Sequence, residues 1–134
     1  GVCHRVSQAI NGARITPHAA ENSECSHAIQ GAQLVISAGA AGVEMLSEKC
    51  RKAEPALQVA IDLNAVPPGG VGGVAPQDKA TDHDGQVCYG ALGVGGLKMK
   101  LHKAALKALF ASNDAVLDAD NIYALAKHLE QQPN

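Results

Sequence analysis

The most distinctive chemical feature of the sequence is a run of four lysines without an acid. The segment 98–107 contains Lys98, Lys100, Lys103 and Lys107 and has a formal charge of +4. A solvated helix face is the usual role of such a run. Lys98 differs from the others because it falls in the first turn of a helix predicted over 97–111, where a cation opposes the helix dipole. Its position indicates a nearby anionic ligand or partner carboxylate.

Three further segments combine glycine or polar residues with a predicted position at the end of a buried strand. They are Ser37-Ala38-Gly39-Ala40, Asp62 to Pro68, and Gly93-Val94-Gly95-Gly96. In open α/β sheets, ligands bind beyond the carboxyl ends of the strands. Glycine allows the backbone to approach a ligand closely, and a helix N-terminus favours anionic groups. The alternative is that all three are only tight turns.

Two polar residues close the apolar run Leu57–Leu63, and a glycine-rich stretch follows them. Asp62 and Asn64 could bond a ribose or a carboxamide, or could instead form an Asx turn that organises the prolines after them. Gly70 to Ala75 matches the G-x-G-x-x-A spacing of a pyrophosphate loop. It follows Pro67-Pro68 rather than a strand, and Pro76 prevents a helix from starting there, so we reject it as a phosphate cradle.

Composition excludes several classes of function. The net charge of −2 and the presence of only three aromatic residues argue against nucleic-acid binding. The cysteines are too far apart for a zinc ribbon, and the histidines lack metal-binding spacing, so we expect no metal site. No apolar run is long enough to span a membrane, and residues 2–10 do not resemble a signal peptide. We therefore expect a cytoplasmic protein without a membrane partner.

The order of predicted elements favours an α/β fold. Helices are expected over 2–10, from Asn22 or Ser23 to Gln30, through Val43, Leu46 and Cys50, over 97–111, and after an Asp118 cap through Leu129; strands are expected over 13–16, 33–37, 57–63 and 86–89. On the lysine-rich helix, Leu97, Leu101, Ala104, Ala105 and Leu109 form the predicted buried stripe. This alternation is typical of a parallel sheet with helices on both faces. It opens on a helix, so we predict a partial Rossmann-like domain over 1–130, without its first strands and glycine-rich turn, and a frayed tail over 131–134.

Two long stretches carry a resemblance to a known family. Residues 62–74, DLNAVPPGGVGGV, resemble the D-L-N-A-x-P-P-x-G-[IV]-x-G-[IV] segment of the NAD(P)-dependent methylene-tetrahydromethanopterin dehydrogenases. Residues 89–103, YGALGVGGLKMKLHK, are similar to that family's [FY]-G-A-[IL]-G-[IV]-G-G-L-K-x-K-x-H-[KR] stretch. Residues 35–42 and 116–127 fit as well. The resemblance covers nearly the whole chain, most loosely before Ile29.

The resemblance implies oxidation of methylene-tetrahydromethanopterin to the methenyl form by hydride transfer to NAD or NADP, as part of a larger enzyme. The residues expected near the dinucleotide are Ser37, Ala38, Gly39, Asn64, Ala65, Gly95 and Gly96. Lys98 is expected near the reacting end, as the candidate catalytic residue. The implied partner is a pterin-type one-carbon carrier, and we expect a homo-oligomer that by itself binds the dinucleotide weakly. A methylene-tetrahydrofolate dehydrogenase module and a catalytically inactive binding module are the alternatives.

Overall fold

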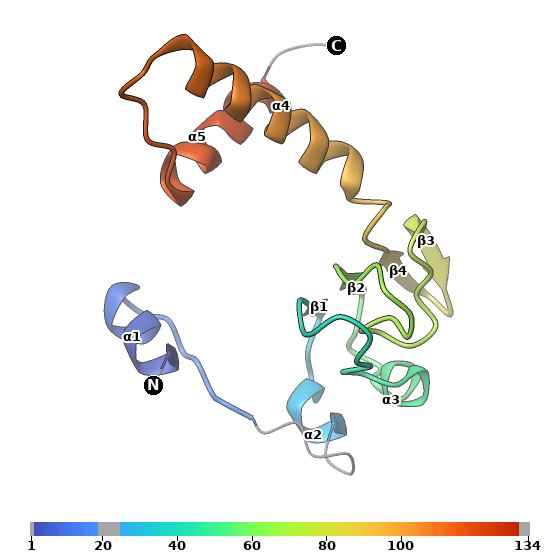
Figure 1. The fold of residues 1–134 in the computed structure, drawn as a ribbon. Coiled ribbons are helices and arrows are strands. Elements are labelled where there is room, and N and C mark those ends of the chain that lie inside the picture. The colour runs from blue at the N-terminus through green and yellow to red at the C-terminus, as the bar shows by residue number, and fades with distance from the viewer. Residues whose placement is uncertain (1, 19–24, 132–134) are drawn as a thin grey trace.

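A computed structural model describes residues 2–18 and 25–131 of the chain. Its helices are α1 (Val2–Ala9), α2 (Cys25–Ile29), α3 (Glu48–Ala53), α4 (Gly95–Ala111) and α5 (Ala119–Glu130), and its strands are β1 (Leu34–Ser37), β2 (Val59–Asp62), β3 (Lys79–His83) and β4 (Gln86–Tyr89). Figure 1 shows the strands and α3 gathered in one body, with α1 and the α4–α5 pair extending away from it. No helix in the described part is long and apolar enough to cross a membrane.

The four strands form one sheet in the order β1-β2-β4-β3. β1 and β4 both run parallel to β2, as the apolar strand patterns predicted, so the mixed α/β class is confirmed. β3 is antiparallel to β4 and was not among the predicted strands. The missed signal is Asp84-Gly85, which joins the two strands with positive φ at both residues.

The core lies between β2, β4 and the loop that follows β2. Ala60 and Cys88 are neighbours in the parallel register and are completely buried. Leu46 and Val71 form an isolated parallel bridge and complete this cluster. Partly buried side chains from α2, α3, β1 and the loop pack around it, namely Ile29, Cys50, Val35 and Val74. This small core consists of aliphatic and cysteine side chains and contains no aromatic residue among those described.

Two predicted elements are wrong. Residues 13–16 form no strand, because this exposed segment pairs with no neighbour among the described residues. The helix predicted from Val43 begins only at Glu48. Leu46 is held in its bridge to Val71, and the Ser47 side chain then accepts the Cys50 N–H as the helix cap. The predicted cap of α2 at Asn22 or Ser23 lies outside the described residues.

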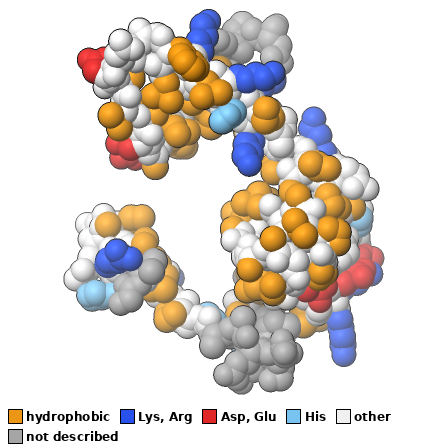
Figure 2. Space-filling model, viewed as in Figure 1, with side chains coloured by type: hydrophobic (Ala, Val, Ile, Leu, Met, Phe, Trp, Pro, Cys, Tyr) orange, Lys and Arg blue, Asp and Glu red, His pale blue; other side chains and the backbone are white. Residues whose placement is uncertain are grey.

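The positions of the two C-terminal helices in the sequence were predicted correctly, but their packing was not. Asp118 caps α5 as predicted by accepting the Asn121 N–H. α4 packs against α5 rather than on the sheet, and neither helix contains a buried residue. None of the predicted buried stripe of α4 is fully buried: Leu101, Ala104 and Ala105 are half-buried, whereas Leu97 and Leu109 are 58% and 39% exposed. Figure 2 shows hydrophobic side chains exposed on both the sheet body and this helix pair.

Candidate functional site

The carboxyl ends of the three parallel strands meet at one edge of the sheet, which we call the carboxyl edge. Ser37 at the end of β1 is opposite Asp62 at the end of β2, and Ile61 is opposite Tyr89 at the end of β4. The three segments singled out in the sequence follow these strand ends. Their convergence at one edge makes this the first candidate for a ligand site.

Asp62 organises the loop that leaves β2. Its carboxylate is 2% exposed and accepts the N–H groups of Asn64 at 3.0 Å, Gly70 at 2.7 Å and Val71 at 3.2 Å. Three backbone donors satisfy a buried carboxylate without a cation. Of the two interpretations open for Asp62, the structure supports the Asx turn.

Asn64 joins the loops that follow β1 and β2. Its Nδ2 donates to the Ala40 carbonyl at 3.0 Å, and its Oδ1 accepts the Val66 N–H at 3.2 Å. The side chain is buried, and both ends of its amide have protein partners. A ribose or carboxamide would have to share these partners, so the predicted ligand contact of Asn64 stays a prediction.

The loop with the pyrophosphate-like spacing uses its amides within the protein. Gly70 and Val71 donate to Asp62, Gly72 donates to the Leu46 carbonyl at 2.7 Å, and Ala75 donates to Asp78 Oδ2 at 2.7 Å. A Cβ on Gly70 would lie 2.0 Å from Ser37 Oγ, so this glycine serves close packing. The donors that a phosphate needs are occupied, in agreement with the rejection of this loop as a cradle.

A hollow of about 520 Å³ opens at the carboxyl edge between the loop after β2 and the start of α4. We call it the edge hollow, and its lining residues are Leu63, Ala65, Ala91, Leu92, Val94, Gly95, Lys98 and Met99. It brings together three of the predicted residues, Ala65, Gly95 and Lys98. Apart from its chain neighbours and the backbone of its own helix, no described atom lies within 4 Å of the position that a Gly95 Cβ would take, so the floor of the hollow is open there. Apolar walls with one ammonium suit a planar ring that carries an anionic group.

The other predicted residues line different hollows. Ser37, Ala38 and Gly39 lie along a second one of about 260 Å³, with Ile36 and Met45. The thioether of Met45 is 3.2 Å from the position of a Gly39 Cβ, so this glycine leaves room for that side chain. Gly96 borders a third hollow, on the β3–β4 side of α4. The predicted residues thus share one edge of the sheet but not one cavity.

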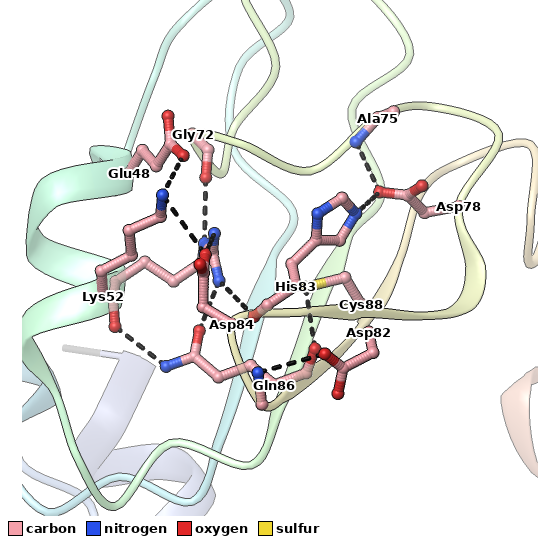
Figure 3. A network of polar contacts seen from close by, with 12 residues as sticks. Glu48, Lys52, Gly72, Ala75, Asp78, Asp82, His83, Asp84, Gln86 and Cys88 are labelled. Carbon is pink, nitrogen blue, oxygen red and sulfur yellow. Dashed lines mark hydrogen bonds and ion pairs between the residues drawn. The ribbon is translucent and has the colours of Figure 1, made fainter.

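Sequence reasoning missed a polar network at the opposite edge of the sheet (Figure 3). The guanidinium of Arg51 is fully buried and donates to the Gly72 carbonyl at 3.1 Å, the His83 carbonyl at 3.4 Å and Gln86 Oε1 at 2.5 Å. Gln86 returns a bond from its Nε2 to the Arg51 carbonyl at 3.1 Å. Asp84 lies 3.6 Å from the guanidinium. This network ties α3 to the β3–β4 hairpin, which is a structural role.

Within the described ranges, neither the buried Cys88 thiol nor the metal-binding side chains form a second site. Burial raises the pKa of Cys88, which therefore stays a neutral thiol at physiological pH. Across the part of the chain that the structure describes, no three His, Cys, Asp or Glu side chains are grouped to hold a metal ion.

The sequence of this chain is similar to two proteins of Methylorubrum extorquens. No protein-family model matches. The chain is 42% identical over 110 residues to the "Bifunctional protein MdtA" of Methylorubrum extorquens, a match that covers 82% of this chain and 38% of that protein. It is 37% identical over 102 residues to the NAD(P)-dependent methylenetetrahydromethanopterin dehydrogenase of the same organism, covering 74% and 34% respectively. The chain therefore spans little more than a third of each of these relatives.

Proposed function

We propose, from the homology of this chain to the NAD(P)-dependent methylenetetrahydromethanopterin dehydrogenase of M. extorquens, that it forms part of the dinucleotide-binding region of such an enzyme. The reaction would be oxidation of methylene-tetrahydromethanopterin to the methenyl form in cytoplasmic one-carbon metabolism. The observation that carries the proposal is the edge hollow, where Ala65, Gly95 and Lys98 meet at the carboxyl ends of parallel strands.

The dinucleotide fits the residues at this edge in part. The edge hollow has apolar walls, an open glycine floor and one cation, which suit a ring and a neighbouring anionic group. The glycine-rich loop over 70–75 offers no cradle for a pyrophosphate, since the amides of Gly70, Val71 and Gly72 bond within the protein. We therefore propose that this chain holds the reacting end of NAD(P) and contributes little to the pyrophosphate.

Five residues of the edge hollow have a definable part in the reaction. Bound NAD(P)⁺ supplies the acceptor for a hydride that leaves the methylene carbon with its bonding electrons, so that no separate proton is released. Leu63, Leu92 and Met99 exclude water from the reacting faces. Lys98 positions an anionic group of the substrate or the dinucleotide, because its ammonium has no ion pair among the described residues. Gly95 lets the ligand approach the backbone.

A chimera tests the proposal. The matched segment of the M. extorquens dehydrogenase would be replaced by this chain, and hydride transfer would be followed by absorbance of the reduced dinucleotide. We expect activity, and we expect Lys98→Ala to lower kcat/KM about tenfold or more. Lys107→Ala, the same change near the end of α4 and away from the edge hollow, is the matched control. Equal kinetics for the two variants would mean that Lys98 has no role beyond that of a solvated residue on the helix surface.

Cofactor binding by this chain alone is expected to be weak. The pyrophosphate finds few free backbone donors, and these contribute much of the affinity of a dinucleotide domain. Calorimetric titration with NADP⁺ and with NAD⁺ checks this. A dissociation constant in the low micromolar range, about −8 kcal/mol, would show that the described residues do contain the missing contacts.

A second candidate is a catalytically inactive binding module. The observation that favours it is that the polar atoms of Asp62 and Asn64 are engaged within the protein. A folded chimera without activity on either a methanopterin or a folate carrier would support this candidate. Activity on the folate carrier alone would instead assign the chain to a methylene-tetrahydrofolate dehydrogenase.

We also propose a homo-oligomer joined through β1. β1 is an edge of the described sheet, and its Leu34 and Ile36 are 52% and 55% exposed. A bare apolar edge strand favours pairing with a second chain. Light scattering should give a dimer, and Ile36→Lys should give a monomer, whereas Val66→Lys in the loop after β2 should remain dimeric. A stable monomer at high concentration, with slowly exchanging amides over 34–37, would exclude this edge as the interface.

A further inference from the structure

The third hollow lies on the opposite side of the α4 start from Lys98 and has a different chemistry. We call it the basic hollow; its volume is about 390 Å³, and its lining residues are Lys79, Tyr89, Gly93, Val94, Gly96, Leu97 and Lys100. Only Gly96 belongs to the residues expected near the dinucleotide. The two lysines and the tyrosine have no role in the function proposed above.

The fold brings the basic side chains together from two separate elements. Lys79 and Tyr89 are directly opposite in the antiparallel register of β3 and β4, so both side chains point to the same face of the sheet. Gly96 and Lys100 are four residues apart on α4 and therefore share one face of that helix. The hollow lies between these two faces, with one lysine on each wall.

The charges of the basic hollow are not neutralised by the protein. No acidic residue lines it, and none occurs in the first turn of α4. Neither Lys79 nor Lys100 takes part in an ion pair within residues 2–18 and 25–131. Lys79 and Lys100 are both exposed, so their ammonium groups are accessible to an anion from solution.

Backbone donors point to the same conclusion. The residue before α4, Val94, offers no side chain to cap the helix. The Gly95 N–H donates to Leu92 and the Lys98 N–H to Val94, but the amides of Gly96 and Leu97 have no acceptor among the described residues. Both of these residues line the basic hollow. The position of a Gly96 Cβ has no atom within 4 Å, so a ligand can reach the backbone there.

From the basic hollow we infer a second anion site, which binds the phosphate group of a small molecule separately from the edge hollow. Lys79 and Lys100 would balance its charge from opposite walls. The Gly96 and Leu97 amides would donate to its oxygens, as at other helix N-termini that bind phosphate. The Tyr89 hydroxyl could donate as well, and the Val94 and Leu97 side chains would contact the group that carries the phosphate.

Titration of the isotope-labelled chain with inorganic phosphate tests this site by NMR. We expect saturable shifts of the Gly96 and Leu97 amides and weaker binding, about tenfold for each lysine, in Lys79→Gln and Lys100→Gln. Lys103→Gln and Lys107→Gln remove the same charge from the same helix outside the hollow and should leave the affinity unchanged. Equal weakening in all four variants would mean general charge attraction and would overturn the site, as would the absence of saturable shifts.

Two further titrations define the ligand and separate this inference from the dinucleotide proposal. Acetate in place of phosphate should bind at least tenfold more weakly, and equal binding would overturn the assignment to phosphate. NADP⁺ should shift the amides of Ala65, Gly95 and Lys98 whether or not phosphate is present. Competition between NADP⁺ and phosphate would show that the two hollows form one site. Failure of NADP⁺ to bind would count against the dinucleotide proposal alone, because the phosphate shifts are measured independently.

Discussion

At one end of its strands the sheet is tied together by a buried guanidinium, whereas at the other end the same strands run into loops and open hollows. Arg51 connects α3, the loop after β2 and the β3–β4 hairpin with bonds from a single side chain. At the carboxyl edge, Asp62 and Asn64 fix only the loops nearest to them. Beyond these loops, Lys98 and Gly95 border open space.

The difference indicates that one end of the sheet stabilises the fold, whereas the other end is available for ligand binding. A network whose members are satisfied by each other fixes the register of the hairpin, but it has no free group to offer a ligand. The carboxyl edge has unneutralised lysines and free helix amides, which do not stabilise the fold and are available for binding. Substitutions at the two ends should therefore affect different properties.

The largest expected effect is loss of stability in Arg51→Met. The substitution leaves the Gly72 and His83 carbonyls and the Gln86 side chain without their buried donor, at a cost of about 3–5 kcal/mol in the free energy of unfolding. Lys52→Met, in the same helix, removes only half-exposed ion pairs to Glu48 and Asp84 and should cost less than about 1 kcal/mol. Urea unfolding compares the two variants. Similar midpoints would mean that the Arg51 network does not hold the hairpin in place.

A smaller difference in stability is expected between substitutions at two glycines, Gly93 before α4 and Gly95 at its start. A Cβ on Gly93 would lie 1.7 Å from the Asp78 carbonyl oxygen, so Gly93→Ala forces the backbone to move and should cost about 1–3 kcal/mol. A Cβ on Gly95 meets nothing within 4 Å, so Gly95→Ala should leave stability within about 0.5 kcal/mol and weaken ligand binding instead. Thermal unfolding and NADP⁺ titration of both variants measure the two effects. Destabilisation by Gly95→Ala would show that a Cβ at the start of α4 meets neighbouring atoms.

Local sequence patterns predicted the parallel part of this fold because its strands are short apolar runs between turn signals. Residues 33–37, 57–63 and 86–89 all contain strands of the observed sheet. Residues 13–16 also form a short segment that ends at a turn signal, but Ile15 is their only large apolar side chain. No described segment pairs with them. The antiparallel strand β3 was missed, although Asp84-Gly85 marks a hairpin.

The sequence predicted which edge of the sheet carries the candidate site, but it did not predict which residues line the same cavity. The position after a strand end follows from topology, which placed Asn64, Ala65, Gly95 and Lys98 at the same end of the sheet. Which hollow each residue lines depends on contacts between distant residues, such as the bond from Asn64 to the Ala40 carbonyl. The partners of Arg51 are 21 to 35 residues away in sequence, so no local pattern identifies them.

The smallest expected effect is a pH dependence at β3, where the side chain of Asp78, just before the strand, contacts His83 at its end. Asp78 Oδ2 accepts the Ala75 N–H at 2.7 Å and lies 2.8 Å from His83 Nε2. Burial by itself raises the pKa of the Asp78 carboxyl, but the Ala75 N–H and the His83 ring outweigh it and hold that pKa below its ordinary value. The unfolded chain therefore binds the proton first as the pH falls.

The stability that Asp78 contributes should accordingly be complete above the ordinary carboxyl pKa of about 4 and disappear as the pH falls through the lower folded value. Asp78→Asn lacks this titration, so the gap in unfolding free energy between the unsubstituted chain and the variant should narrow as the pH falls from about 6 to about 3, below the ordinary carboxyl pKa. Asp120→Asn, at the exposed start of α5, is the control and should show a gap that changes less. Urea unfolding at a series of pH values measures both. A gap for Asp78→Asn that stays constant or widens on acidification would mean that the Ala75 and His83 contacts do not favour the ionised carboxylate in solution.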